Sequence, residues 1–305
     1  MAPSLPTRAR RALRSVALGG LARILAFVPL RVALALATGL SWAGWHVAGR
    51  TRRQVLAHLE MAFPELTPAA REALGRSCMR HLAWVVAEMM AIRSYESRLD
   101  DYVTFAPGSE ATLRELMAPG RGLVMVSGHV GHWELLARRV VRAGIPCATV
   151  ARSGTSPVLQ AFLSRFRADS GFEVLLRDDP GTARAIIRCL RTGKLLGLLI
   201  DQDTKVQGVF APFFGRPAWT PRAAGDLALR FRAPVAVIWS RRRGPHAGDG
   251  HELTVMPVSY DADAADREAE SVRITLACTA QLEKAIRERP SEWVWMHERW
   301  RTRPA

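Results

Sequence analysis

Two side chains capable of acid–base chemistry lie close together within residues 122–141. An apolar run over 122–127 predicts a buried strand, and after a Ser-Gly break the apolar residues resume with helical spacing. His129 falls in the predicted turn and Glu134 in the first turn of the predicted helix. An imidazole beside a carboxylate is a general base whose tautomer the carboxylate fixes. The spacing therefore predicts a His129–Glu134 catalytic pair at the carboxyl end of a strand, where α/β proteins present reactive groups.

A metal site is a competing interpretation of the same segment. His129, His132 and Glu134 are close enough in sequence to share an ion. However, the helical zinc motif places its two histidines four residues apart, and here they are three apart. No further cluster of cysteines, histidines or carboxylates stands out to complete the site. We therefore expect no metal, and a purely structural role for a histidine at a strand end also stays open.

Two further predicted strands end in polar residues. One ends at Arg152, and a later apolar strand stops at Asp201 and Gln202. The predicted strands alternate with helices, which favours an α/β fold with a mostly parallel central sheet and helices on both faces. In such a sheet the strand ends would bring His129, Arg152 and Asp201 to the same edge.

The composition points to an anionic partner. The chain has 305 residues and a formal net charge of +15. Such an excess of positive charge favours nucleic acid, an anionic membrane surface or a phosphorylated substrate. The cysteines are scattered without metal or disulfide spacing, which is typical of a reduced, cytosol-facing domain; they are Cys78, Cys147, Cys189 and Cys278.

The first 50 residues predict attachment to a membrane. Residues 1–14 are basic, and residues 32–49 carry no formal charge and include two tryptophans. A spanning helix needs roughly 20 apolar residues, so this segment is marginal, and a cleaved signal peptide or a bent interfacial anchor are alternatives. Flanking arginines and tryptophans favour an uncleaved apolar anchoring helix. We expect a basic tail and membrane anchor over 1–50 and one catalytic domain over 51–305.

These features together resemble the late acyltransferases of lipid A biosynthesis. This lauroyl/myristoyl acyltransferase family belongs to the lysophospholipid-acyltransferase-like superfamily, and the resemblance covers nearly the whole chain. It rests on five blocks in the same order: the H-x4-[DE] segment from His129 to Glu134, Arg152, the Asp201-Gln202 strand end, the Phe-x-Pro-Phe-Phe-Gly block at 210–215, and the closing segment 293–304. The fold implied is glycerol-phosphate-acyltransferase-like.

The resemblance implies transfer of a fatty acyl chain from acyl carrier protein to a hydroxyl of a lipid A precursor. No acyl-enzyme is needed, because an activated hydroxyl can attack the thioester directly, and no G-x-S-x-G nucleophile motif is present. No cofactor is implied beyond acyl carrier protein as co-substrate. Catalytic roles fall to His129 and Glu134, and substrate-binding roles to Arg152, Asp201, Gln202, Phe213 and Gly215.

The expected partners are acyl carrier protein, an anionic glycolipid acceptor and the inner membrane, with the catalytic domain facing the cytoplasm. All three are negatively charged, which suits a basic enzyme. Acylation of another membrane glycolipid, such as a phosphatidylinositol mannoside, is the main alternative. A metal-dependent hydrolase anchored in the membrane is another. A nucleic-acid-binding protein would explain the charge and the Trp/Arg-rich tail but not the His129–Glu134 turn, so we expect no nucleic acid partner.

Overall fold

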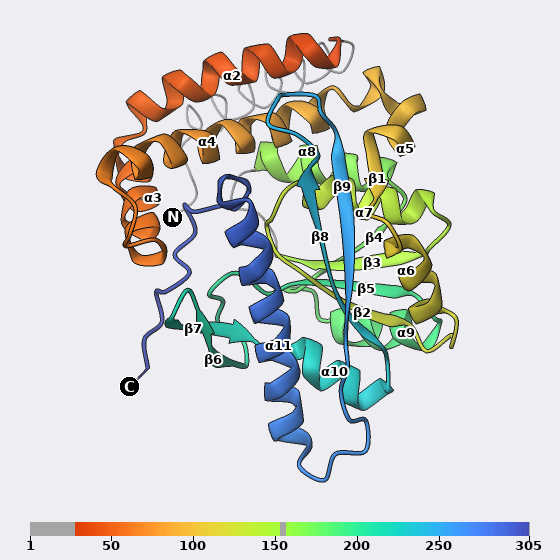
Figure 1. The fold of residues 1–305 in the computed structure, drawn as a ribbon. Coiled ribbons are helices and arrows are strands. Elements are labelled where there is room, and N and C mark those ends of the chain that lie inside the picture. The colour runs from red at the N-terminus through yellow and green to blue at the C-terminus, as the bar shows by residue number, and fades with distance from the viewer. Residues whose placement is uncertain (1–27, 153–156, 305) are drawn as a thin grey trace, which may run out of the picture.

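A seven-stranded sheet forms the centre of the computed structural model, which describes residues 28–152 and 157–304 (Figure 1). Its strands are β1 (Val103–Phe105), β2 (Leu123–Ser127), β3 (Cys147–Ala151), β4 (Glu173–Leu176), β5 (Leu195–Leu199), β8 (Val235–Arg242) and β9 (His251–Val258). They lie in the order β1-β9-β8-β2-β5-β3-β4. Only the β8–β9 pair is antiparallel among these neighbours. The expected mostly parallel sheet is therefore confirmed.

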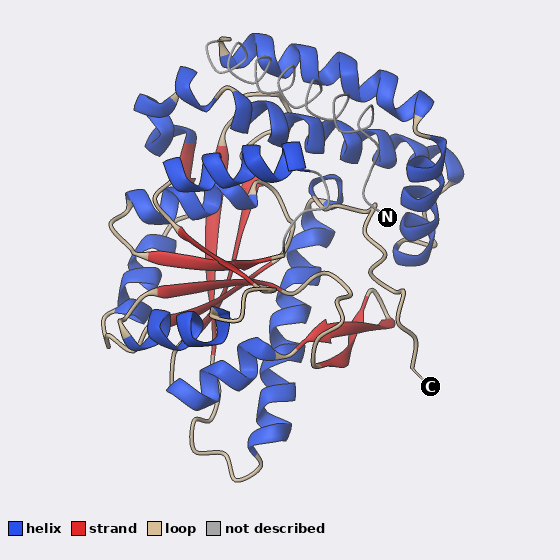
Figure 2. Ribbon diagram, turned by 180° about the vertical axis from the view of Figure 1, so that it is seen from behind, coloured by secondary structure: helices blue, strands red, loops and turns tan. Residues whose placement is uncertain are grey.

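Helices cover both faces of the sheet (Figure 2). Those that follow or join its strands are α6 (Ser109–Met117), α7 (Trp133–Arg142), α8 (Pro157–Asp169), α9 (Thr182–Arg191), α10 (Ala223–Phe231) and α11 (Arg267–Glu288). Successive side chains of a strand point to opposite faces, and in β2 Met125 packs into the core under α7 and α8 while Val126 packs under α9, α10 and α11. The sheet thus lies between two hydrophobic cores, and the central strands contribute side chains to both.

Three helices precede the sheet: α2 (Leu30–Val47), α3 (Gly49–Ala62) and α4 (Pro68–Met90). The start of α4 is capped as its sequence predicts, because the Thr67 side chain accepts from the backbone N–H of Ala70 and proline occupies the first turn. Helix α2 runs along α4 (Figure 1), and Trp45 fits against Gly75, where an added Cβ would lie 2.5 Å from the indole. Short helical turns then lead to β1: Ile92–Ser94, Glu96–Arg98 and α5 (Leu99–Tyr102).

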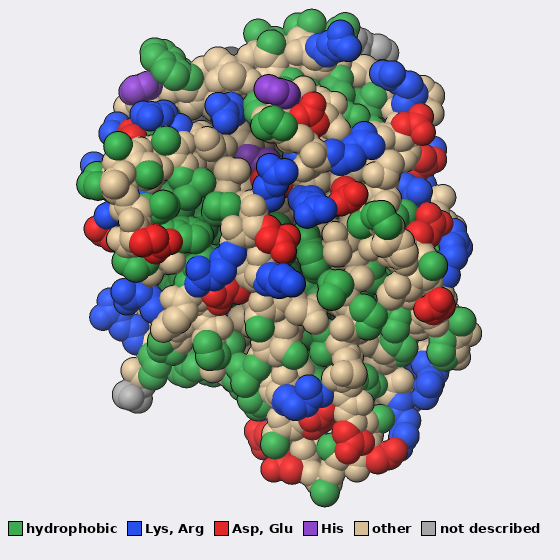
Figure 3. Space-filling model, in the orientation of Figure 1, with side chains coloured by type: hydrophobic (Ala, Val, Ile, Leu, Met, Phe, Trp, Pro, Cys, Tyr) green, Lys and Arg blue, Asp and Glu red, His purple; other side chains and the backbone are tan. Residues whose placement is uncertain are grey.

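Of the alternatives for the predicted anchor, a spanning helix is not found in the part of the chain that the structure describes. No helix within 28–152 or 157–304 combines the length and apolar character needed to cross a bilayer. The predicted basic tail at 1–14 lies outside the described residues. Helix α2 instead buries one side against α4 and leaves large apolar side chains exposed on the other, visible along the upper edge of Figure 3.

The glycine- and proline-rich block at 208–215 forms a hairpin rather than the irregular loop that its composition suggests. Strands β6 (Gly208–Phe213) and β7 (Arg216–Pro221) pair antiparallel. Phe214 and Gly215 make the turn, both with positive φ. The hairpin packs on α11, where the backbone N–H of Phe214 donates to Glu283 over 2.7 Å.

Candidate active site

His129 and Asp201 meet at the carboxyl edge of the sheet, beyond the ends of β2 and β5. The Nδ1 of His129 lies 2.9 Å from Oδ1 of Asp201, and the backbone N–H of His129 donates to Oδ2 over 2.6 Å. The indole N–H of Trp293 donates to the same Oδ2 over 2.8 Å. Burial raises the pKa of Asp201, but the charge and hydrogen bonds of His129 and Trp293 outweigh burial and hold that pKa well below its ordinary value. An ionised carboxylate therefore fixes the imidazole with Nδ1 as donor and Nε2 directed elsewhere.

Glu134 forms no hydrogen bond or ion pair with His129, so the predicted pairing of these two side chains is corrected. Its carboxylate instead accepts three hydrogen bonds from Arg167 on α8, at 2.5 to 3.1 Å. The reason is local: α7 begins at Trp133, and the first helical turn directs Glu134 toward α8 rather than back across the bend. Trp133 itself packs edge-on against His129, with ring centroids 5.0 Å apart.

Backbone contacts hold the turn that carries His129. Gly131 has a φ of 60°, and an added Cβ would lie 2.0 Å from the carbonyl oxygen of Ser240, so only glycine fits here. Its N–H donates to the carbonyl of Glu292 over 2.9 Å, and its own carbonyl lies 3.1 Å from Nε2 of His81. The next N–H, of His132, donates to the hydroxyl of Ser240 over 2.5 Å. The turn is thus fixed by α4, β8 and the C-terminal segment.

His132 is a structural residue rather than a metal ligand. It is fully buried, and its Nδ1 caps α7 by accepting from the N–H of Leu135 over 3.2 Å. No group of histidines, cysteines and carboxylates within the described ranges could hold a metal ion. Burial is the main reason that the pKa of His132 lies well below its ordinary value, so the ring is neutral.

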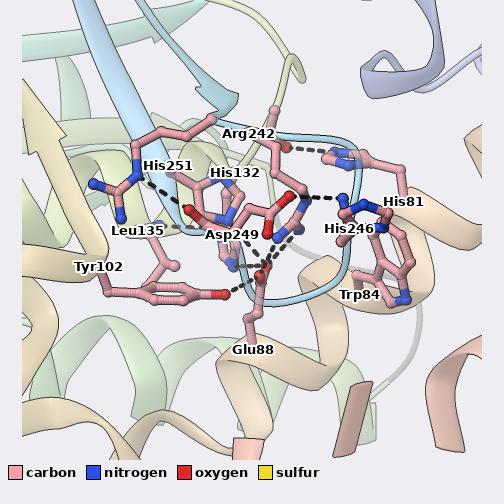
Figure 4. A network of polar contacts seen from close by, with 12 residues as sticks. His81, Trp84, Glu88, Tyr102, His132, Leu135, Arg242, His246, Asp249 and His251 are labelled. Atoms are coloured by element: carbon pink, nitrogen blue, oxygen red, sulfur yellow. Dashed lines mark hydrogen bonds and ion pairs between the residues drawn. The ribbon is translucent and has the colours of Figure 1, made fainter. Parts of the chain in front are cut away.

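A buried network centred on Glu88 of α4 supports this turn from behind (Figure 4). Glu88 is 0% exposed and forms two hydrogen bonds with Arg242, at 2.8 and 3.1 Å. It also accepts from the hydroxyl of Tyr102 over 2.6 Å and lies 3.2 Å from Nε2 of His251. Burial raises the pKa of Glu88, but His251 and Arg242 hold it well below its ordinary value. Each of these two charged residues taken alone is typical of a surface position, yet the structure buries both, in one ion pair.

Gln202 and His297 complete the surroundings of His129. The Nε2 of Gln202 lies 3.4 Å from Nδ1 and 3.3 Å from Nε2 of His129, nearly equal distances that place the amide against the face of the imidazole. The same amide donates to Nε2 of His297 over 2.8 Å. Burial and the nearby His129 lower the pKa of His297 to about 4, so that ring is a neutral acceptor at pH 7. His297 was not predicted as a site residue, although it stands in the closing segment that the sequence singles out.

A largely apolar cavity of about 540 Å³ opens beside His129. Polar groups at its wall include Glu134, Arg152, Arg167 and Gln202, and Arg152 follows the end of β3 as expected. Two other residues that were predicted to bind substrate, Phe213 and Gly215, are not among the described residues that line this cavity. Phe213 is buried against Trp293, with ring centroids 5.5 Å apart, and Gly215 forms the hairpin turn.

The arrangement is that of a general base beside an apolar binding cavity. A neutral imidazole held by a buried carboxylate can take a proton from a hydroxyl and return it to a leaving group. The cavity can accept a hydrocarbon chain of a substrate. None of the four cysteines is suited to act as a nucleophile, because all are buried and burial raises the pKa of each thiol.

The chain is similar to several known acyltransferases. The family model for bacterial lipid A biosynthesis acyltransferases matches residues 7–302. The chain is 25% identical to a lipid A biosynthesis lauroyltransferase of Escherichia coli K12, over 91% of this chain and 88% of that protein. It is 26% identical to a lipid A biosynthesis acyltransferase of Haemophilus influenzae, over 87% and 83%. A phosphatidylinositol mannoside acyltransferase of Mycobacterium tuberculosis is 26% identical over 60% of this chain and 56% of its own length.

Proposed function

This chain belongs to the bacterial lipid A biosynthesis acyltransferase family and is an O-acyltransferase, and we propose that it transfers a fatty acyl chain from acyl carrier protein to a hydroxyl of a lipid A precursor. The observation that carries the proposal is the His129–Asp201 pair at the wall of an apolar cavity. The relatives that match most of this chain are named for lipid A biosynthesis, which supports this acceptor.

His129 is the general base of the proposed reaction. Its Nε2 takes the proton of the acceptor hydroxyl while the oxygen bonds to the thioester carbonyl carbon. The tetrahedral intermediate then collapses, the C–S bond breaks, and the imidazolium returns the proton to the leaving thiolate. Asp201 stabilises the imidazolium and keeps Nδ1 protonated throughout. General base catalysis of this kind contributes typically about 10²–10⁴-fold to the rate.

Gln202 is the proposed donor to the oxyanion of that intermediate. Its amide nitrogen lies within 3.4 Å of both ring nitrogens of His129. The carbonyl that is attacked must lie close to this base, and therefore close to the amide. One of its N–H groups is held by neutral His297, and this leaves the second N–H to face the reacting centre. A donor fixed before the reaction stabilises the developing charge without reorganisation.

Charge and the outer surface support the proposed partners. Arg152 is exposed at the cavity wall, where its guanidinium can pair with a phosphate of the acceptor or of the carrier's prosthetic arm. The net charge of +15 favours an acidic carrier protein and an anionic leaflet. Exposed apolar side chains along α2, namely Val32, Leu36, Leu40, Trp42 and Val47, suit insertion into a membrane interface. We therefore place the protein at the inner membrane with its active site on the cytoplasmic side.

Acyl transfer in detergent micelles tests this function. The purified protein and its His129→Ala variant would be incubated with acyl carrier protein thioesters and a Kdo-bearing tetra-acylated lipid A precursor, and products read by mass spectrometry. The proposal predicts a mass gain of one acyl chain that the variant loses. No gain with any thioester, from folded protein, would remove the lipid A assignment. A phosphatidylinositol mannoside offered in parallel tests the related glycolipid, because acyltransferases of that class also match this chain.

A further inference from the structure

The cavity beside His129 extends onto both faces of the sheet. Its lining includes residues of β3 from both faces of the strand: Cys147 and Thr149 on one face, and Ala148 and Val150 on the other. Alternate residues of a strand point to opposite faces, so a cavity that reaches both sets must wrap around the carboxyl ends of the strands. His129 and Gln202 stand at that edge, between the two halves.

The half under α7 and α8, here termed the α7/α8 lobe, is apolar and deep. Its lining side chains are Met125, Leu136, Ala137, Cys147, Leu163 and Phe172. Five of them belong to the core on that face, and Leu163 packs against it. Two charged groups at the wall, Glu134 and Arg167, form an ion pair and neutralise each other. A saturated hydrocarbon chain can lie along this lobe without leaving a polar group unpaired.

The length of the α7/α8 lobe follows from the strand that forms its wall. The lobe runs from Ala151, at the carboxyl end of β3, to Cys147, at its first residue, with Phe172 just before the start of β4. Four residues of strand span about 13 Å. An extended hydrocarbon chain advances about 1.3 Å per carbon, given C–C bonds of about 1.5 Å. The lobe therefore has room for about ten carbons, and the approach from His129 adds one or two.

The half under α9 and α10, here termed the α9/α10 lobe, is shallower and more polar. Along β3 it extends no deeper than Ala148, one residue short of Cys147, and its other lining side chains include Thr182, Ile186, Gln207, Ala223 and Asp226. Ala223 is exposed at the start of α10, so this lobe is open to the surroundings. Such a lobe suits a chain whose far end stays in the membrane.

We propose that each lobe binds a chain of a different lipid substrate. The α7/α8 lobe holds a saturated donor chain of about ten to twelve carbons, and Cys147 and Phe172 form its closed end. The α9/α10 lobe holds a hydrocarbon chain of the acceptor. This rests on the acyl transfer proposed above. A donor chain delivered from a water-soluble carrier must be buried along its whole length, which the deeper lobe provides, whereas a membrane lipid needs cover only near the reacting hydroxyl. The two chains would approach His129 from opposite faces of the sheet.

Competition among donors tests the assignment. Acyl carrier protein charged with saturated chains of eight to sixteen carbons would be mixed in equal amounts with the lipid A precursor, and product masses counted for the wild type and three variants. Ala137→Leu fills the α7/α8 lobe, Phe172→Ala lengthens it at its closed end, and Ala223→Leu is the matched filling of the α9/α10 lobe. We expect a wild-type optimum at ten to twelve carbons. Ala137→Leu should favour shorter chains, by about fourfold for each methylene that no longer fits, and Phe172→Ala longer ones.

The control variant distinguishes the α7/α8 lobe from the α9/α10 lobe. Ala223→Leu should leave the chain-length profile unchanged while raising the KM for the acceptor. A wild-type optimum at sixteen carbons, or a profile that shifts with Ala223→Leu and not with Ala137→Leu, would overturn the assignment. Absence of all transfer would instead contradict the proposed function. Because the two α7/α8 substitutions act in opposite directions, poor folding of one, detected by its melting temperature, leaves the other decisive.

Discussion

Asp201 contacts His129 twice: its Oδ1 lies 2.9 Å from the ring Nδ1, and its Oδ2 accepts the backbone N–H of the same residue over 2.6 Å. One carboxylate thus sets both the tautomer of the imidazole and the conformation of the turn that carries it. The two residues come from neighbouring parallel strands, β2 and β5, whose carboxyl ends meet at this edge. The pairing depends on the topology of the sheet rather than on proximity in sequence.

Gln202→Ala should lower kcat for acyl transfer by about 10²–10³-fold with little change in KM, because it removes a donor that acts on the transition state. His297→Ala should lower kcat in the same sense but less, and His297→Gln should restore part of it by offering another acceptor to the amide. The measurement is steady-state kinetics of acyl transfer. His58→Ala is the matched control, since His58 contacts the same C-terminal segment at the carbonyl of Trp295 but not Gln202. An equal loss of kcat in His58→Ala would assign the effect to general disorder of that segment.

Glu88→Ala should destabilise the protein by about 3–5 kcal/mol, because it leaves the guanidinium of Arg242 buried without its counter-charge. Chemical denaturation of wild type and variant gives the difference in free energy of unfolding. Glu110→Ala serves for comparison: its hydrogen-bonding partner Arg114 is exposed and Arg139 lies 3.9 Å away, so the change should cost no more than about 0.5 kcal/mol. Similar costs for both variants would contradict the anchoring role of Glu88.

Gly131→Ala should be far more damaging than Gly120→Ala, although both glycines have positive φ. At Gly131 a Cβ would meet the Ser240 carbonyl at 2.0 Å, whereas at Gly120 nothing lies within 4 Å. Gly120→Ala should therefore lose only the backbone preference, about 1 kcal/mol. Melting temperatures compare the two, and transfer activity should fall for Gly131→Ala alone. Equal melting temperatures would show that the turn can move away from β8.

Stability should fall as the pH drops from 8 to 5. Burial first, and then His129, lower the pKa of His297 from 6.5 to about 4 in the folded protein. Between those values the unfolded chain binds the proton and the folded protein does not, so unfolding becomes more favourable as pH falls through 6.5, and the loss stops below about 4. For His297 alone the cost at pH 5 is about 2 kcal/mol. Denaturation at the two pH values should show a smaller difference in His297→Gln; an unchanged difference would contradict this.

Much of the fold could be predicted from the sequence because its local patterns agree with its tertiary structure. The alternation of apolar strands with helices predicts the mostly parallel sheet, and Thr67 followed by proline is typical of the helix start that it forms at α4. The hairpin at 208–221 was missed, since proline and glycine obscure the alternation of its strands. Spacing along the chain also favoured Glu134 as the partner of His129. The partner proved to be Asp201, 72 residues later, because only strand order brings these two together.

The burial of the Glu88–Arg242 ion pair could not be predicted from the sequence pattern either. Glu88 and Arg242 are 154 residues apart, and each taken alone is typical of a surface. Only the packing of α4 against β8 and β9 makes them a pair. His297 was missed for a similar reason, because its role depends on the amide of Gln202, which comes from a distant strand end.

The most direct test of the mechanism compares Asp201→Asn with Glu134→Gln in single-turnover acyl transfer, using protein whose folding is checked by circular dichroism. If Asp201 is the partner of His129, Asp201→Asn should lower the rate constant by about 10³–10⁴-fold, as expected when an imidazole loses its correct tautomer. Glu134→Gln, which weakens an ion pair with Arg167 at the cavity wall but leaves the His129–Asp201 pair in place, should lower it by less than about tenfold. A large loss in Glu134→Gln together with a small one in Asp201→Asn would contradict the His129–Asp201 mechanism.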